Sequence, residues 1–205
     1  MKIVTKREDL LEPLLHIGGI VERRQTLPIL ANILVNVGHG MINLTATDLE
    51  VELKTQAVAQ SEGEVDFTVP ARKMLDICKA LPEGAELVIQ IEGDKAKLFS
   101  GRSRFSLGLL PAQDYPVIEP TPSSTVVTLK SGTLKRLIDK TQFAMAQQDV
   151  RYYLNGMLLE ISQGDVRTVA TDGHRLAFSM SLNSVPSDID LQVILPRKAV
   201  LELGR

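Results

Sequence analysis

Apolar residues recur with two different periods along the chain, and the two periods predict different elements. Residues 7–17 carry apolar side chains three and four positions apart, which is typical of one face of a helix. Pro13 lies inside this stretch and is expected to kink the helix or delay its start. Elsewhere apolar residues alternate with polar ones, as in strands with one buried face. Strands are therefore predicted at residues 2–5, 29–37, 41–45, 49–59, 65–69, 86–91, 95–99 and 103–109, and a second helix at residues 71–81.

The same order of elements returns in the second half of the chain. The pattern predicts a strand at residues 125–129, a helix at 134–143, strands at 154–161, 166–169 and 176–182 within a region that runs from residue 152 to 195, and a helix that begins at Pro196. Residues 111–124 hold four prolines and few apolar residues, which is typical of a linker.

These patterns predict two domains of unequal completeness. We assign a first domain to residues 1–118, a linker to residues 119–126 and a second domain to residues 127–205. The second domain lacks counterparts of the last three strands of the first. We therefore expect the chain to be a fragment of a longer protein.

The two halves are also related residue by residue. Ala46-Thr47-Asp48 matches Ala170-Thr171-Asp172 at an offset of 124 residues. The same offset relates Leu10 to Leu134, Leu14 to Ile138, Leu30 to Leu154, Leu34 to Leu158 and Gly40 to Gly164, and with a two-residue insertion Val69-Pro70 matches Leu195-Pro196. A repeat period of this length indicates two similar domains.

After the shared Thr-Asp pair the two copies diverge. The first continues as Leu49-Glu50-Val51-Glu52 and the second as Gly173-His174-Arg175-Leu176. We interpret the shared residues as a scaffold that caps a turn. The divergent residues are a candidate position for function, because a scaffold alone does not require the difference.

Composition narrows the class of protein. With 205 residues, 44% of them hydrophobic, the chain is globular and large enough for two cores. The single cysteine, Cys78, excludes a disulfide framework and favours a reducing compartment. Neither a signal peptide nor an apolar run long enough to cross a bilayer is predicted. We therefore expect a cytoplasmic protein without a membrane segment.

The charge is unevenly distributed. A net charge of −2 argues against a generally basic nucleic-acid-binding protein, yet the predicted helices at residues 70–81, 132–142 and 196–205 each contain more Lys and Arg than Asp and Glu. For one helix, a solvated face would be a sufficient explanation. Repeated domains place their helices on a common side, so three such helices favour a basic layer that faces a phosphate backbone.

Five long motifs resemble one protein family. They are Arg24-Gln25-Thr26-Leu27-Pro28-Ile29-Leu30, Val69-Pro70-Ala71-Arg72-Lys73, Ser100-Gly101-Arg102-Ser103-Arg104-Phe105-Ser106-Leu107, Gln148-Asp149-Val150-Arg151-Tyr152-Tyr153-Leu154-Asn155-Gly156-Met157 and Thr168-Val169-Ala170-Thr171-Asp172-Gly173-His174-Arg175-Leu176-Ala177. Through them the chain resembles the bacterial DNA polymerase III β subunit family, the replicative sliding clamps. The resemblance covers essentially the whole chain, as the N-terminal domain and most of the middle domain.

The resemblance implies both a fold and a function. The fold is an α+β DNA clamp, in which repeated domains carry antiparallel sheets on the outside and paired helices on the inside. The function is that of a non-catalytic processivity factor in DNA replication, in which a homodimer ring encircles double-stranded DNA without reading its sequence. Short peptide motifs attach the DNA polymerase catalytic subunit, the clamp loader and repair proteins. No cofactor and no metal is implied, and any nucleotidyltransferase activity belongs to the polymerase holoenzyme.

Three sets of site residues follow from the resemblance. The DNA-binding set is Arg24, Arg72, Gln148, Tyr152, Tyr153, Lys135, Arg136, Lys140, Arg197 and Lys198. The partner-peptide pocket is Arg151, Leu154, Thr171, Gly173, His174, Arg175 and Leu176. The dimer-contact set is Lys73, Ile77, Arg102, Arg104, Phe105 and Leu107.

Structural roles remain open for some of these side chains. Strand alternation is expected to bury one of the two tyrosines, Tyr152 or Tyr153. Leu154 matches Leu30 in the repeat and could belong to the core alone. The same alternative holds for the apolar residues of the predicted strand at 103–109.

Two other functions compete with the clamp. Asp172 and His174 lie two positions apart and would share a face of a strand, so they could form an acid–base dyad of a hydrolase. No Ser or Cys nucleophile motif, no metal-ligand spacing of the three histidines and no glycine-rich phosphate loop supports an enzyme. The second alternative is a protein-interaction scaffold that does not bind DNA.

Overall fold

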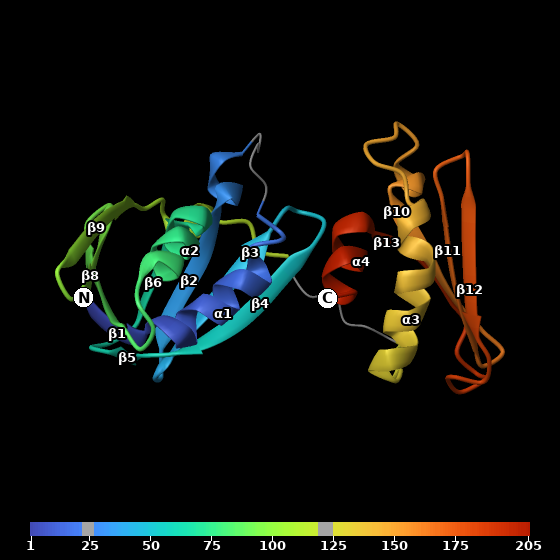
Figure 1. Cartoon of the computed structure of the whole chain (residues 1–205), viewed down its shortest axis with the longest axis horizontal. Coiled ribbons are helices and arrows are strands. Elements are labelled where there is room, and N and C mark those ends of the chain that lie inside the picture. Colours follow the sequence, from blue (N-terminus) through green and yellow to red (C-terminus); the bar gives the residue numbers. More distant parts are fainter. Residues whose placement is uncertain (22–26, 119–124) are drawn as a thin grey trace. The chain divides into compact units, whose positions relative to one another are not determined.

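Two units with the same kind of layering make up the chain. The computed structural model describes residues 1–21, 27–118 and 125–205. Its two units are Met1–Glu119 and Pro120–Arg205. In each unit, two α-helices pack on antiparallel sheet (Figure 1). The predicted α+β class is therefore confirmed.

The first unit contains two sheets. The four-stranded sheet has the order β4-β3-β2-β6, and the five-stranded sheet has the order β5-β1-β7-β8-β9. The strands are β1 (Lys2–Lys6), β2 (Asn32–Gly38), β3 (Met41–Thr47), β4 (Glu52–Val58), β5 (Gln60–Ser61), β6 (Val65–Pro70), β7 (Glu86–Glu92), β8 (Lys95–Ser100) and β9 (Ser103–Gly108). The helices are α1 (Arg7–Ile17) and α2 (Ala71–Ala80), with short 3-10 helices η1 (Pro28–Ala31) and η2 (Ala112–Asp114).

Apolar faces hold both helices of the first unit to its sheets. Leu10, Leu14 and Ile17 of α1 are buried in one cluster with Met74 and Cys78 of α2. Complete burial of a side chain of this size contributes about 1.5–3 kcal/mol. Burial also raises the pKa of the Cys78 thiol to about 11, so this sulfur stays protonated and packs as a small apolar group.

The second unit repeats the first. Its elements are α3 (Ser131–Thr141), η3 (Gln142–Ala144), η4 (Tyr152–Leu154), β10 (Gly156–Ser162), β11 (Asp165–Thr171), β12 (Leu176–Ser181), β13 (Leu191–Pro196) and α4 (Arg197–Leu203). Each strand and each α-helix begins 124 or 126 residues after its counterpart in the first unit. The strand order β12-β11-β10-β13 matches β4-β3-β2-β6 element by element.

The pairing register repeats as well. Leu34 lies opposite Thr45 and Thr68 in the first unit, and its counterpart Leu158 lies opposite Val169 and Ile194 in the second. A slip of one residue would turn every side chain of a strand to the other face. The shared register therefore confirms the internal repeat that the sequence predicted.

The predicted strand at residues 125–129 is absent. In the first unit its counterpart β1 pairs with β7 and β5, and the described part of the second unit contains no counterpart of β7. A strand without a partner leaves its backbone groups unpaired. Val127 and Leu129 instead pack against a small apolar cluster that contains Leu137.

Three other predicted strand boundaries were wrong for local reasons. Residues 28–31 form η1 rather than the start of a strand, and residues 152–154 form η4 in the same way. β4 begins at Glu52 because residues 48–51 are held in a turn. The predicted range of the first helix is confirmed, because α1 begins at Arg7, and the buried Pro13 does not delay its start.

The first residues of the predicted linker belong to the first unit. Thr68 Oγ1 donates to the carbonyl of Leu110 at 2.9 Å, and the Leu110 N–H donates to the same hydroxyl at 3.1 Å. Tyr115 is 5% exposed, and its hydroxyl accepts the Thr47 N–H at 3.2 Å and donates to the Asn32 carbonyl at 3.3 Å. Burial raises the pKa of Tyr115 to about 12. A linker therefore does not begin at residue 111, because an anchored tyrosine follows it.

Candidate functional sites

The turn that the two repeats share is built by the same bonds in both. Thr47 Oγ1 donates to the Val51 carbonyl at 2.9 Å, and Thr171 Oγ1 donates to the Arg175 carbonyl at 2.7 Å. Asp48 Oδ1 accepts two backbone N–H groups in the first unit, and Asp172 Oδ1 accepts the two equivalent ones in the second. The Thr-Asp pair is therefore a scaffold, as predicted.

The residue after this pair has a left-handed backbone in both turns. Its φ is 78° at Leu49 and 88° at Gly173. Leucine adopts this region only at a cost, whereas glycine does so readily. In the second unit the space that a side chain would take is used by Arg151: a Cβ at Gly173 would lie 3.2 Å from Arg151 Nη2. Gly173 thus lets the guanidinium of Arg151 lie against the turn.

Arg175 is fixed by two contacts that the first repeat lacks. Its Nε donates to Asp172 Oδ2 at 3.0 Å, and its guanidinium lies 5.7 Å from the centre of the Phe143 ring. The equivalent positions in the first unit are Val51 and Gly19. Phe143 is 58% exposed and was absent from the predicted pocket. A comparison of the two repeats could have identified Phe143 as a candidate, because the equivalent position in the first unit is Gly19.

The proposed Asp172–His174 dyad is not formed. Asp172 accepts the backbone N–H groups of His174 and Arg175, both at 3.0 Å, and the side chain of Arg175. The first of these bonds lowers the pKa of Asp172 most, and the others lower it further. The carboxylate is thus held ionised to close the turn, and it makes no hydrogen bond to the imidazole in the described structure.

The predicted pocket residues lie at and beside the turn between β11 and β12, and their side chains differ in exposure. Leu154 is 8% exposed and Leu176 is 67% exposed, so Leu154 is largely buried and the side chain of Leu176 faces solvent. Thr171 and Leu176 lie opposite each other in neighbouring strands. The arrangement can supply an apolar contact at Leu176 beside the cationic groups of Arg151 and Arg175.

A hydrogen-bonded loop precedes this region. The side chain of Asn155 accepts the N–H of Asp149 and donates to its carbonyl, both at 2.9 Å. Arg151 donates twice to the Asp149 carboxylate, at 3.0 and 2.9 Å, and these bonds lower the pKa of Asp149 to about 2. Gln148, with a positive φ of 55°, is exposed at the tip of the loop. Asn155 was not a predicted site residue, and only its place in the Gln148–Met157 motif pointed to it.

Both tyrosines are exposed, so the expectation that one is buried was wrong. Tyr152 is 82% and Tyr153 50% exposed, and their rings meet edge to face at 5.9 Å. They lie in η4, where the two-residue alternation of a strand does not apply. Exposed rings of this kind can stack on unpaired bases.

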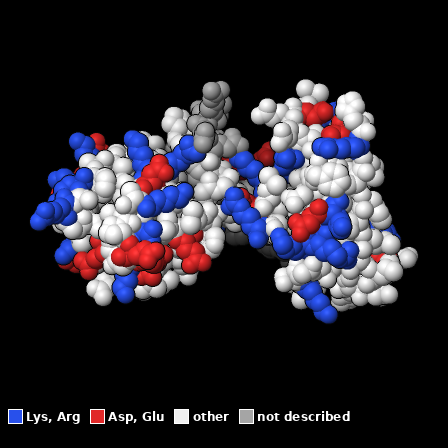
Figure 2. Space-filling model, in the orientation of Figure 1, with Lys and Arg blue, Asp and Glu red and all other residues white. Residues whose placement is uncertain are grey.

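Basic residues lie on the exposed faces of two helices. Arg72, Lys73 and Lys79 of α2 are exposed, and so are Lys135, Arg136 and Lys140 of α3. Figure 2 shows Lys and Arg over α3, and Asp and Glu over the first turns of α1. Such a surface can bind phosphates.

The other predicted DNA contacts differ in availability. Arg197 of α4 is half-buried and donates to the Met145 carbonyl at 3.2 Å, which ties α4 to the segment after α3. Lys198 is half-buried as well. Arg24 lies outside the described residues.

The predicted dimer contact lies on and near an edge strand. β9 ends the five-stranded sheet, and Arg104 on it lies 5.0 Å from the centre of the Phe99 ring. Leu107 is 5% exposed and Phe105 packs partly against the same core, so the structural role left open for these two residues applies. An edge strand can pair with a second chain.

Two other kinds of site are absent from the described residues. Within residues 1–21, 27–118 and 125–205, no helix is both long and apolar enough to span a membrane. Among the same residues, no group of three or more His, Cys, Asp or Glu side chains is arranged to hold a metal ion.

Two family sequence profiles match the chain in succession. Residues 1–119 match the N-terminal domain of the DNA polymerase III beta subunit, and residues 128–205 match its central domain. The chain belongs to the DNA polymerase III beta subunit family.

Individual members of this family are similar over the whole chain. The Beta sliding clamp of Pseudomonas aeruginosa is 52% identical over 206 residues, and that of Escherichia coli K12 is 52% identical over 208. The chain is covered completely in both, but spans only 56% of the length of each relative.

Solved structures of family members share the fold. A DNA polymerase sliding clamp from P. aeruginosa, crystallised with a ligand, matches with a TM-score of 0.90 at 50% identity, over 100% of this chain and 56% of that one. Caulobacter crescentus pol III beta matches with the same score at 39% identity, over 100% and 57%. The DNA-clamp fold inferred from the motifs is therefore confirmed.

Proposed function

We propose that this chain is the N-terminal and central part of a sliding-clamp subunit that encircles duplex DNA and keeps the replicative polymerase on it. The observation that carries the proposal is the repeated unit with Lys and Arg on the solvent faces of α2 and α3. Membership of the DNA polymerase III beta subunit family supports the same role. The chain contributes contacts rather than catalysis.

Binding by such a surface is electrostatic and independent of sequence. Lys and Arg on a helix face reach phosphate oxygens, which are the same at every base pair. A clamp that moves along DNA requires contacts of this kind. We assign the duplex contacts to Arg72, Lys135, Arg136 and Lys140, and contacts with unpaired bases to Tyr152 and Tyr153. Arg24, Gln148, Arg197 and Lys198 complete the proposed set.

We assign the capture of partner peptides to the turn of the second unit. Arg151, Thr171, Gly173, His174, Arg175 and Leu176 would receive short motifs of the polymerase, the clamp loader and repair proteins, with Leu154 below them. A partner side chain that becomes fully buried gains about 1.5–3 kcal/mol. Cationic groups beside the apolar contact favour a peptide with an acidic or carboxamide group.

Assembly and domain limits complete the proposal. In the longer protein, the edge strand β9 with Arg104 and Phe105, together with Lys73, Ile77, Arg102 and Leu107, would form the contact between subunits of a homodimer ring. The proposed domains remain residues 1–118 and 127–205, joined by residues 119–126.

The experiment compares two variants with equal changes in charge. In one, Lys135, Arg136 and Lys140 of α3 are replaced by Glu, and in the other Lys54, Lys95 and Lys97 on strands of the first unit are replaced by Glu. Binding of a labelled duplex is measured by fluorescence anisotropy between low and physiological salt. We expect the α3 variant to lose binding and the strand variant to keep most of it.

The salt dependence provides the second measure. Removal of one phosphate contact should lower the slope of log K against log salt by about 0.9. Equal weakening in both variants, or binding that salt does not affect, would reject the helical surface and favour a scaffold that does not bind DNA.

A further inference from the structure

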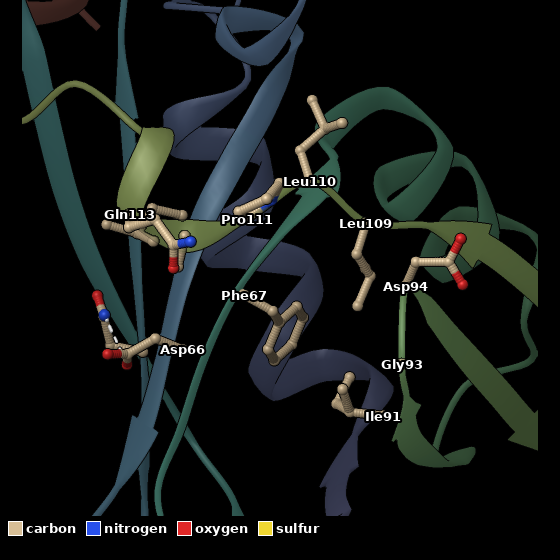
Figure 3. Close-up of a pocket in the computed structure, with 12 residues that line it drawn as sticks. Asp66, Phe67, Ile91, Gly93, Asp94, Leu109, Leu110, Pro111 and Gln113 are labelled. Atoms are coloured by element: carbon tan, nitrogen blue, oxygen red, sulfur yellow. Dashed lines mark hydrogen bonds between the residues drawn. The ribbon is translucent and has the colours of Figure 1, made fainter.

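The first unit carries a groove that none of the proposed interfaces uses. It has a volume of about 630 Å³ and is bounded by β6, by the turn between β7 and β8, and by residues 109–113 (Figure 3). Phe67, which is 4% exposed, belongs to the floor of the groove, with Asp66 on one side of it and Asp94 on the other (Figure 3). Leu34 and Leu109 extend the apolar lining. The groove therefore combines an apolar floor with an acidic rim.

One wall of the groove is an open strand edge. β6 ends the four-stranded sheet and β9 ends the five-stranded sheet. Within the described residues, a single isolated bridge joins Thr68 of β6 to Leu110, which lies two residues after the end of β9. From Thr68 back to Val65, β6 otherwise pairs only with β2 in the described structure. An extended peptide can add to an edge of this kind through backbone hydrogen bonds.

The negative charge of the rim favours extended peptides that carry cationic side chains. None of the described residues that line the groove is Lys or Arg. Asp66 Oδ1 accepts one hydrogen bond from Asn36 Nδ2 at 2.8 Å, and Asp94 is exposed. Neither carboxylate takes part in an ion pair within the described part of the chain. A cationic side chain would therefore find acidic partners on both sides of the apolar floor.

We propose that this groove binds an extended peptide segment of a partner protein, in which an apolar side chain is flanked by Lys or Arg. Successive side chains of a strand point to opposite sides. The apolar side chain can therefore enter toward Phe67 and Leu109 while its neighbours turn to the rim at Asp66 and Asp94. This site lies in the first unit and does not depend on the proposed DNA or peptide contacts of the second.

The probe is a labelled nine-residue peptide of alternating valine and lysine, tested against the 205-residue chain by fluorescence anisotropy. A peptide of alternating valine and glutamate has the same length and apolar content with the opposite charge. We expect the lysine peptide to bind and the glutamate peptide not to bind. Asp66→Asn and Asp94→Asn should each weaken binding about two- to fivefold, as expected for exposed ion pairs.

The matched control is Asp76→Asn on α2, which removes the same charge from a residue outside the groove. It should leave the affinity unchanged. Hydrogen exchange gives an independent readout, because the amides of residues 65–68 should become protected when the lysine peptide binds. Equal binding of the two peptides, an equal effect of the control, or protection only elsewhere would overturn the proposal.

A second copy of this chain, rather than a partner peptide, could also occupy the groove, and this alternative is tested separately. Sedimentation of the chain alone over a range of concentrations measures self-association. A dimer that Asp94→Asn abolishes would assign the groove to a second copy and overturn the proposal of a partner peptide. A monomer at all concentrations would support it.

Discussion

At the scale of single residues, one turn is built twice with the same bonds and different neighbours. The Thr-Asp scaffold uses backbone groups of the next three residues, so it tolerates Leu49-Glu50-Val51 in one copy and Gly173-His174-Arg175 in the other. This tolerance explains how one copy could acquire the cationic group of Arg175, and room at Gly173 for the guanidinium of Arg151, without a change of fold.

Gly173→Ala should destabilise the second unit. Its φ of 88° is unfavourable for any residue with a Cβ, and that Cβ would meet Arg151. We expect the free energy of unfolding to fall by about 1–2 kcal/mol, measured by chemical denaturation. Gly132→Ala is the control: Gly132 lies in α3 with nothing within 4 Å of its Cβ position, and the change should raise stability by about 0.5–1 kcal/mol. Equal effects of the two substitutions would contradict the backbone argument.

The pair of Asp149 and Arg151 should make stability depend on pH in the acid range. The pKa of Asp149 is lowered from 3.8 to about 2 in the folded state, chiefly by the side-chain hydrogen bonds from Arg151. Because the folded pKa is depressed, the stabilisation is present above pH 3.8 and is lost as the pH falls toward about 2. Titration of the carboxyl carbon by NMR should show this low pKa, and Arg151→Met should return it toward 3.8. An unchanged pKa in the variant would remove Arg151 as the cause.

At the scale of elements, residues 110–118 and the turn at Thr47 hold each other in place. The Tyr115 hydroxyl joins the Thr47 N–H to the Asn32 carbonyl, and the N–H of Ile118 donates to Glu52 Oε2 at 3.0 Å. The segment that leaves the first unit is thus anchored to the turn that corresponds to the proposed pocket of the second.

Tyr115→Phe tests this anchor. The substitution keeps the ring and removes the hydroxyl, which leaves a buried N–H and a buried carbonyl without this partner. We expect a loss of about 1–3 kcal/mol in the free energy of unfolding, measured by urea denaturation. Tyr153→Phe alters an exposed hydroxyl and should change stability by less than about 0.5 kcal/mol. A Tyr115 variant as stable as the Tyr153 variant would show that the anchor contributes nothing.

A graft of one repeat onto the other tests the peptide pocket. Replacing His174, Arg175 and Leu176 by the first-unit residues Glu, Val and Glu should abolish binding of a labelled peptide that contains leucine and phenylalanine. The turn itself should survive, because Thr171 and Asp172 are retained. Fluorescence anisotropy gives the affinity and a thermal melt gives the control for folding. Unchanged affinity together with an unchanged melting curve would return these three residues to the scaffold.

At the scale of the whole molecule, each of the two repeated units carries one helix with an exposed basic face, although these two helices are not counterparts in the repeat. α2 and α3 present their Lys and Arg to solvent, whereas the first turn of α1 is acidic. The net charge of −2 therefore conceals a local basic surface on each unit. Local charge, rather than the total, decides the attraction to a phosphate backbone.

Arg72→Ala and Lys140→Ala should weaken duplex binding by a similar factor for every DNA sequence. Each substitution should lower the salt slope by about 0.9, because one phosphate contact is removed. Anisotropy titrations with two duplexes of unrelated sequence at several salt concentrations provide the measurement. Lys54→Ala, on a strand, is the control and should change neither quantity. A preference of either variant for one duplex would indicate base contacts and contradict a surface that slides.

The sequence by itself determined the repeat, the main elements and the family. A helix or strand with one buried face requires apolar residues at a regular spacing, and this spacing is visible in the sequence. The two copies of the unit are recognised because their matching residues keep a constant offset. The bounds of α1 were predicted to the residue, and the Thr-Asp turn was identified with its role.

Only the tertiary structure decided features that depend on distant partners. Residues 125–129 have the alternation of a strand but no strand beside them in the described structure, so the predicted pairing fails. The sequence placed Tyr115 in a linker. In the structure its hydroxyl is hydrogen-bonded to the backbone of Thr47 and Asn32, which are 68 and 83 residues away in the chain. The contact of Phe143 with Arg175 and the groove at Phe67 likewise join segments far apart in the chain. Local periodicity records which face of an element is buried, but not which partner buries it.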